Sequence, residues 1–171
     1  MSIYTEQEIA HIVDALKILG EKGFPVPPQV FDAWCGACIT VPIELAVLRK
    51  ASDGTPEVLM IHRDDKFFLG WHIPGSILLP GETEEIVFRR LARKEVIGRI
   101  SPPQFIDRMH TMKGNENSRG QEVSLLFACF FENQQSPVGQ FFPLHNPPED
   151  TIGEHKPFLK RIARWWQETS R

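Results

Sequence analysis

The sequence predicts an α+β fold, an α/β/α sandwich around a mixed sheet with an additional helix at the N-terminus. The spacing of apolar residues, which changes along the chain, supports this prediction. Apolar residues recur at helical spacing before residue 20 and alternate along strands from Ile39 onward. The pattern then places one central helix between two groups of strands and one amphipathic helix at the end, an order typical of a layered domain. The length of 171 residues suits one domain with a short appendage.

The N-terminal segment is predicted to be a single helix. Thr5 followed by Glu8 has the pattern of a capping box, and apolar residues follow at positions 9, 12, 13, 16 and 19. We expect Gly20 and Gly23 to end the helix and the proline-rich stretch 24–28 to form an extended linker. Residues 1–28 are thus assigned as helix and linker, and residues 29–171 as the main domain. An amphipathic helix of this kind packs on the main domain or on a partner subunit, so a homodimer is one expectation.

A β-hairpin is expected next. Alternate positions from Ile39 to Val47 are apolar, which predicts a strand with one side buried, and Pro42 within it indicates an edge position or a bulge. The turn 52–56 leads into the second strand, Glu57 to His62.

The second half of the chain is predicted to alternate helix, strands and helix. We expect a helix from about Thr83 to Ile97, ended by Gly98, and a strand pair at about 104–112 and 122–131 joined by the polar turn 113–120. After a loop at 143–150, Thr151 and Glu154 are expected to open the last helix as a second capping box. Its apolar face comprises Phe158, Leu159, Ile162, Trp165 and Trp166.

Composition and charge exclude several classes of function. Hydrophobic residues make up 42% of the chain, and 19 basic against 22 acidic residues give a net charge of −3, which offers no basic face for nucleic acid. The longest apolar run, Leu125 to Phe131, is far below the roughly 20 residues that span a bilayer, so no membrane partner is expected. No signal peptide is visible, and three cysteines cannot all pair within one chain. These features predict a reduced, cytoplasmic protein.

The segment from Trp71 to Gly98 carries the chemistry. A glycine-containing turn leads through a loop into a helix with an acidic first turn, and such an entry offers backbone N–H groups to anions. By the spacing of three and four residues, Lys94 and Glu95 share a helix face with Val87 and Leu91. On the chemistry of these residues alone, an ordinary amphipathic helix with solvated charges is the favoured interpretation.

This segment resembles the Nudix box, G-x5-E-x7-R-E-U-x-E-E-x-G-U, preceded by W-x-[apolar]-P-G. The lead-in is matched from Trp71 to Gly75, and counting from Ser76 at the first glycine position puts Glu82, Arg90 and Glu95 on box positions. The resemblance covers roughly residues 39–168 and implies a Nudix fold. It also implies a hydrolase that acts on a nucleoside diphosphate linked to another moiety, a small-molecule ligand, with Mg²⁺ or Mn²⁺ as cofactor.

Four positions depart from the box, and they change what the resemblance implies. They are Ser76 for glycine, Leu91 and Lys94 for glutamates, and Ile97 for the closing glycine. The sequence is closer to the altered box of GDP-mannose mannosyl hydrolases, matched by Glu82-Thr83, Phe88 to Leu91, and Glu95. Such enzymes keep one metal and cleave at the sugar carbon with a histidine base.

The resemblance implies a set of site residues. The metal would be held chiefly by Glu95, with a backbone carbonyl near Ser76 and the carboxylate of Glu82. Glu95 and Arg90 count among the catalytic residues, and the base would be His155, before the last helix, with His145 as runner-up; a histidine near pKa 6.5 can accept a proton at neutral pH. The substrate would contact Arg63, Trp71 and Lys94.

Plainer roles are open for several of these residues. Either histidine could be a solvated surface residue, Arg63 could form a surface salt bridge, and Trp71 could fill the core. Lys94 either supplies a fixed positive charge beside the phosphates or extends outward into water.

Two alternative functions remain at this stage. One is a Nudix-fold nucleotide-binding module in which Leu91 and Lys94 mark lost catalysis. The other is a thiol redox protein, because Trp34 to Cys38 resembles the thioredoxin active site W-C-G-x-C. That chemistry requires a helix after the second cysteine. Since a strand is expected there, we interpret Cys35 and Cys38 as thiols on a strand.

Overall fold

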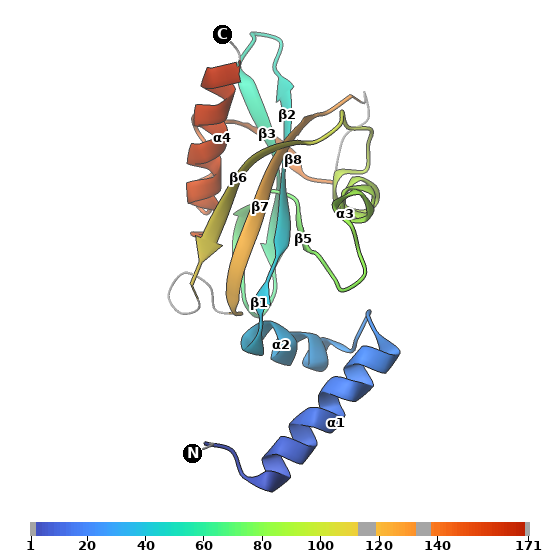
Figure 1. Cartoon of the computed structure of the whole chain (residues 1–171). Coiled ribbons are helices and arrows are strands. Elements are labelled where there is room, and N and C mark those ends of the chain that lie inside the picture. Colours follow the sequence, from blue (N-terminus) through green and yellow to red (C-terminus); the bar gives the residue numbers. More distant parts are fainter. Residues whose placement is uncertain (1–2, 113–118, 133–137, 170–171) are drawn as a thin grey trace.

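The computed structural model describes residues 3–112, 119–132 and 138–169, and the turn 113–118 lies outside these ranges. Four α-helices, a π-helical turn (η1) and eight strands occur in them (Figure 1). The first half holds α1 (Glu6–Lys22), α2 (Pro28–Ala37), β1 (Ile39–Thr40), β2 (Pro42–Lys50), β3 (Pro56–Asp64), β4 (Leu69–His72) and β5 (Gly75–Ile77). The second half holds α3 (Glu84–Leu91), η1 (Ala92–Val96), β6 (Gln104–Thr111), β7 (Gln121–Phe130), β8 (Gln140–Pro143) and α4 (His155–Thr169).

A mixed sheet forms the centre of the molecule, as predicted. Its strand order is β1-β7-β2-β3-β4, with β5 on β2, β6 on β7 and β8 on β3. The expected hairpin is β2 and β3, paired antiparallel, while β2 runs parallel to β7 with Ile43 opposite Leu125. The expected strand pair is β6 and β7, also antiparallel. Helices α3 and α4 lie on opposite faces of this sheet (Figure 1), which is the predicted α/β/α sandwich.

The prediction for the first strand of the hairpin is wrong in one respect. Seven consecutive residues of β2 are buried, because α3 covers one face of the sheet and α4 covers the other. Ile43, Leu45 and Val47 pack in the cluster under α3, whereas Ala46 and Leu48 pack in the cluster under α4. Pro42 is therefore not at a sheet edge. It is the first residue of an interior strand, a position that needs no ladder N–H.

The N-terminal region contains one helix more than predicted. The capping box of Thr5 and Glu8 is confirmed, but α1 continues through Gly20 to Lys22. Pro28 does not belong to an extended linker, since it opens α2. Proline suits the first turn of a helix because its missing N–H would have no partner there. The boundary between residues 28 and 29 stays a prediction.

The two later helices differ from expectation at their ends. The central helix loosens into η1 and ends at Ile97, which adopts a left-handed conformation with φ 47°. The last helix begins at His155, not at a capping box of Thr151 and Glu154. The Thr151 hydroxyl instead donates to the Pro148 carbonyl and closes a loop. The apolar face is as predicted, with Phe158, Leu159 and Ile162 buried and both tryptophans packed against that cluster.

Candidate active site

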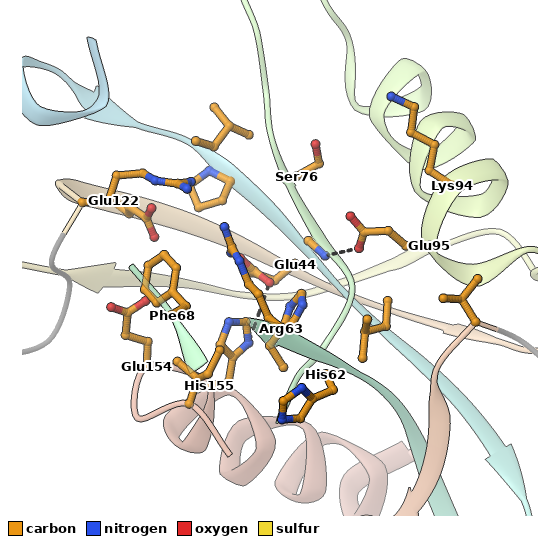
Figure 2. Close-up of a pocket in the computed structure, with 18 of the residues that line it drawn as sticks. Glu44, His62, Arg63, Phe68, Ser76, Lys94, Glu95, Glu122, Glu154 and His155 are labelled. Atoms are coloured by element: carbon orange, nitrogen blue, oxygen red, sulfur yellow. Dashed lines mark hydrogen bonds and ion pairs between the residues drawn. The ribbon is translucent and has the colours of Figure 1, made fainter. Parts of the chain in front are cut away.

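A cavity of about 530 Å³ opens where β2 and β5 meet η1 and the start of α4. Its volume falls within the usual range for a small-molecule pocket. Strands β3, β4 and β7 and helix α2 also contribute lining residues, so segments from most of the chain converge on it. Figure 2 shows its polar side chains.

Glu44 is the deepest acidic group of the cavity. It shares a face of β2 with Ala46 and Leu48 by the two-residue period, and that face looks toward α4. The side chain is buried, and its Oε2 atom has no hydrogen-bond partner among the described residues. Burial raises the pKa of Glu44 well above its ordinary value, and the nearby Glu122, Glu95 and Glu154 raise it further. The site therefore favours a neutral Glu44 until a positive charge arrives.

Gly75 lies beside Glu44 and also binds a second carboxylate, that of Glu95. It lies opposite Glu44 in the pairing of β5 with β2. A Cβ atom at Gly75 would come within 2.4 Å of Glu44 Oε2, so any other residue would displace the carboxylate or β5. The backbone N–H of Gly75 donates to Glu95 Oε2 at 3.2 Å. Gly75 thus lies beside both acidic groups, because its missing side chain leaves room for Glu44 and its N–H donates to Glu95.

Glu95 reaches the cavity from η1. Burial raises the pKa of Glu95, and the hydrogen bond from Gly75 and the charges of Arg63, Arg90 and Lys94 oppose that rise. Two carboxylates that resist ionisation thus meet at one glycine. A bound cation would stabilise the charged form of both carboxylates.

Two buried histidines lie on the opposite wall. His155 Nδ1 is 4.0 Å from Glu44 Oε2 and has no hydrogen-bond partner among the described residues. Burial lowers the pKa of His155 well below its ordinary value, helped by His72 and Arg63. His72 stacks edge-on against it, donates from Nδ1 to the Ile73 carbonyl at 2.7 Å, and has its pKa lowered to about 4, chiefly by burial. Both imidazoles are therefore neutral at physiological pH.

Arg63 supplies positive charge at the middle of the cavity (Figure 2). Asp65 accepts a hydrogen bond from its Nε at 2.5 Å, and its guanidinium lies over the Phe68 ring at 4.6 Å. The charge of Arg63 lowers the pKa of both Glu44 and Glu95 and also that of both histidines. One guanidinium is thus electrostatically coupled to every buried titratable group of the site.

An aromatic wall flanks this charge. Phe31 from α2 and Phe68 line the cavity, and the Arg119 guanidinium lies 5.7 Å and 5.6 Å from the centres of their rings. Flat apolar rings beside guanidinium groups can stack on a planar heterocycle and bind the phosphates attached to it.

Five of the residues predicted from the sequence line the cavity. They are Arg63, Ser76, Lys94, Glu95 and His155. Lys94 and Glu95 do face the same cavity, but Lys94 is exposed at the rim while Glu95 is half-buried. Leu91, which stands at a glutamate position of the box, is buried in the core between α3 and the sheet.

Glu82 and Arg90 are held together outside the cavity lining. Their side chains form an ion pair, Glu82 also accepts from the Leu79 N–H at 3.0 Å, and Arg90 donates to the Ile77 carbonyl at 2.9 Å. These bonds fasten the loop after β5 to α3. The pair thereby positions the segment that carries Gly75 and Ser76.

Trp71 and His145 also lie outside the cavity lining. Trp71 packs against the core under α4 and stacks on Phe142 with ring centres 4.8 Å apart. His145 is exposed.

The lining residues that the sequence analysis missed include Glu44, His72, Glu122 and Glu154. A signal existed for Glu44, because it is a single carboxylate within the apolar run from Ile43 to Leu48. A charge is rarely placed in a buried strand unless it has a partner or a function. None of the other three is a lone carboxylate within an apolar run, so they carry no comparable signal.

The oxygen atoms that line the cavity are of the chemical type that binds a hard divalent cation. Carboxylate and carbonyl oxygens are the ligands that Mg²⁺ and Mn²⁺ prefer, and the buried Glu44 oxygen without a partner is the donor that such an ion would satisfy. In the part of the chain that the structure describes, however, no three acidic, histidine or cysteine side chains already converge closely enough to hold a metal.

The cysteine motif lies at the wrong end of a helix for redox chemistry. The prediction that Cys35 and Cys38 lie on a strand is wrong, because α2 includes Cys35 and ends just before Cys38. Strand β1 follows, so no helix N-terminus stabilises a thiolate. Burial instead raises the pKa of Cys35.

No family model matches the chain, and no curated protein sequence does. Within the described residues, no helix has the length and apolar character needed to cross a bilayer.

Solved structures share the fold. The NUDIX domain of Shewanella oneidensis NrtR, crystallised with ADP ribose, has a TM-score of 0.60 and 15% identity over 82% of this chain and 93% of that chain. The MutT NUDIX hydrolase of Burkholderia pseudomallei has a TM-score of 0.59 and 15% identity over 73% of this chain and 98% of that chain. NrtR of S. oneidensis complexed with a 27mer DNA has a TM-score of 0.58 and 19% identity over 75% of this chain and 63% of that chain.

These similarities establish that the chain has the Nudix fold, as the resemblance implied. The relation to GDP-mannose mannosyl hydrolases stays a prediction.

Proposed function

We propose that this chain is a Nudix-type hydrolase that cleaves a nucleoside diphosphate linked to a sugar or a related moiety, with one divalent cation as cofactor. The observation that carries the proposal is the pair of buried polar atoms, Glu44 Oε2 and His155 Nδ1, which face each other without hydrogen-bond partners among the described residues. Buried polar groups are normally satisfied, so such a pair indicates a site that a ligand completes.

Glu44 and Glu95 are the residues we assign to the cation, with a backbone carbonyl near Ser76. Their raised pKa values support this assignment, because burial raises both of them and a bound cation would favour the charged form of each carboxylate. When bound, Mg²⁺ or Mn²⁺ would supply positive charge against the diphosphate oxygens. Glu82 and Arg90 then act as positioning residues, through the loop that they fasten to α3.

Arg63 and Lys94 are the residues we assign to the diphosphate. Arg63 stands in the middle of the cavity, where its planar fork suits two phosphate oxygens. Lys94 adds a second positive charge at the rim. For the nucleobase we assign Phe68 and Phe31 in place of Trp71, since these two rings line the cavity.

His155 is the residue we assign as the base. Its lowered pKa leaves the imidazole neutral before the substrate binds, and the negative diphosphate would raise that pKa toward neutrality. In the proposed step, water forms a bond to the sugar carbon and gives its proton to His155. The bond from that carbon to the diphosphate oxygen breaks, and its electron pair stays on the nucleoside diphosphate.

The test is a panel of nucleotide sugars, dinucleotides and nucleoside triphosphates with Mg²⁺ or Mn²⁺, read by product identity. In ¹⁸O-labelled water, attack at carbon puts the label in the sugar, whereas attack at phosphorus puts it in a phosphate. We expect Glu95→Gln to lower the metal-dependent turnover by roughly 10²-fold, because it removes a ligand charge and keeps the shape. Glu85→Gln, on the exposed first turn of α3, is the matched control.

A nucleotide-binding module is the second candidate. It is favoured by Leu91, which is buried in the core where the box has a glutamate, and by the exposed Lys94. Calorimetry separates the two candidates. A module binds a nucleotide from the panel without releasing product at any metal concentration, and that result would overturn the proposed hydrolysis.

A further inference from the structure

Helix α1 lies apart from the sandwich. It connects to the body only through the turn into α2 and points away from the sheet (Figure 1). All residues of α1 are in the described part of the chain, and none of them is buried. We expected this helix to pack either on its own domain or on a partner subunit. The structure does not contain the first of these two arrangements.

A continuous apolar stripe runs along this free helix. Its members follow the 3-4-3 spacing that brings side chains to one face, and they are Ile9, Ile12, Leu16 and Leu19. Leu16 is 60% exposed and Ile12 is 45% exposed. Such a stripe is the seam by which two helices pack together, with Ile9 and Leu16 at one set of core positions and Ile12 and Leu19 at the other.

The charges beside this stripe are self-complementary in one orientation. Glu8, Ala15 and Lys22 follow each other at seven-residue intervals along one flank of the stripe. When a second α1 runs antiparallel, Glu8 of each copy faces Lys22 of the other, and the small Ala15 faces its own copy at the centre. The core layers then pair Ile9 with Leu19 and Ile12 with Leu16, so every layer is apolar.

A parallel arrangement has no such match. It would place the acidic first turns, with Glu6 and Glu8, next to each other. It would also bring both bodies to the same end of the pair. The antiparallel arrangement separates the bodies by the length of α1, about 25 Å for 17 residues.

We propose that α1 is a dimerisation helix whose partner is α1 of a second copy of this chain, packed antiparallel through the stripe from Ile9 to Leu19. The contact is a short one, so the dimer dissociates on dilution. The inference is independent of the cavity, because no residue of α1 lines it.

Sedimentation velocity of the full chain over a wide range of concentration tests the proposal. Leu16→Glu should weaken dimerisation by at least about a hundredfold, because the symmetric contact carries each change twice. Ile18→Glu is the matched control. Ile18 is 53% exposed on the same helix but lies off the stripe, so dimerisation should survive.

A charge exchange tests the orientation. Lys22→Glu and Glu8→Lys should each weaken self-association, whereas an equimolar mixture of these two variants should form the heterodimer, since both flanking pairs become attractive again. Lys17→Glu makes the same charge change away from the flank and should have little effect. Recovery in the mixture also shows that each variant helix still folds, although Glu8 belongs to the capping box.

Several results would overturn the proposal. A wild-type chain that stays monomeric at the highest concentration has no such dimer. Equal weakening by Leu16→Glu and Ile18→Glu would mean that the stripe is not the contact. A dimer that Leu16→Glu weakens, but whose charge variants do not recover on mixing, would reject the antiparallel arrangement.

Discussion

The Nδ1 atom of His155 lies 4.0 Å from Oε2 of Glu44, and both atoms are buried without a hydrogen-bond partner among the described residues. One atom belongs to the first residue of α4 and the other to an interior strand. Each would normally cost stability in that state, and the cost is tolerated where a ligand is to be bound.

Glu44→Gln should stabilise the metal-free chain increasingly as the pH rises. The folded pKa of Glu44 is raised above 4.5, so the unfolded state loses its proton first and wild-type stability falls with rising pH. Glutamine resembles the protonated form and does not titrate. The difference in unfolding free energy should be near its minimum below pH 4.5 and grow by about 1.4 kcal/mol per pH unit up to the folded pKa.

Denaturant unfolding with a chelator present, at several pH values, measures this difference. Glu85→Gln is a suitable control, because Glu85 is exposed and a hydrogen bond from Thr83 lowers its pKa. A difference that stays flat with pH would contradict the raised pKa of Glu44.

Gly75→Ala should disable the site by moving Glu44. The added methyl group would lie 2.4 Å from Glu44 Oε2, so either the carboxylate or β5 must shift. We expect a loss of about 1–3 kcal/mol of stability and at least a tenfold loss of divalent-cation affinity by calorimetry. Gly20→Ala is the contrasting change, since its methyl group meets nothing within 4 Å inside α1 and should stabilise the chain slightly. Unchanged cation affinity in Gly75→Ala would remove Glu44 from the assigned ligands.

Ile97→Gly should stabilise the chain. A β-branched residue in the left-handed conformation, here at φ 47°, is strained by about 1–2 kcal/mol. Glycine relieves the strain but adds freedom to the unfolded chain, so the expected gain is up to about 1 kcal/mol. Ile97→Asn should gain a similar amount, because asparagine tolerates this conformation, whereas Ile97→Val should gain nothing. Thermal unfolding of the three variants gives the order, and a gain in Ile97→Val would show that strain is not the cause.

Lys94→Glu should weaken the binding of a nucleoside diphosphate and strengthen the binding of a divalent cation. If Lys94 acts on the diphosphate, the variant should bind a nucleoside diphosphate about tenfold more weakly without metal and bind a divalent cation more tightly. Arg93→Glu is the control, because Arg93 is exposed on η1 and does not line the cavity. If both binding free energies of Lys94→Glu stay within about 0.5 kcal/mol of wild type by calorimetry, Lys94 is a surface residue that contacts neither ligand.

Local patterns in the sequence were sufficient for most of the architecture. The hairpin, the strand pair, the central helix and the apolar face of α4 are all encoded by periodicity over a few residues, together with caps and turns. Helix α2 was missed because a run of prolines favours an extended linker as much as the start of a helix. The burial of β2 on both faces was missed because Ala46 and Leu48 give only a weak alternation.

For the site, the sequence by itself indicated Arg63, Lys94, Glu95 and His155, which all line the cavity, since motif register and residue chemistry are local properties. Only the tertiary structure decided that Glu44 belongs with them and that Glu82 and Arg90 pair with each other outside the cavity lining. The meeting of Glu44, Gly75 and His155 depends on the register of β5 on β2 and on where α4 begins. Those relations arise when distant segments pack against one sheet, and no local pattern records which side chains then face each other.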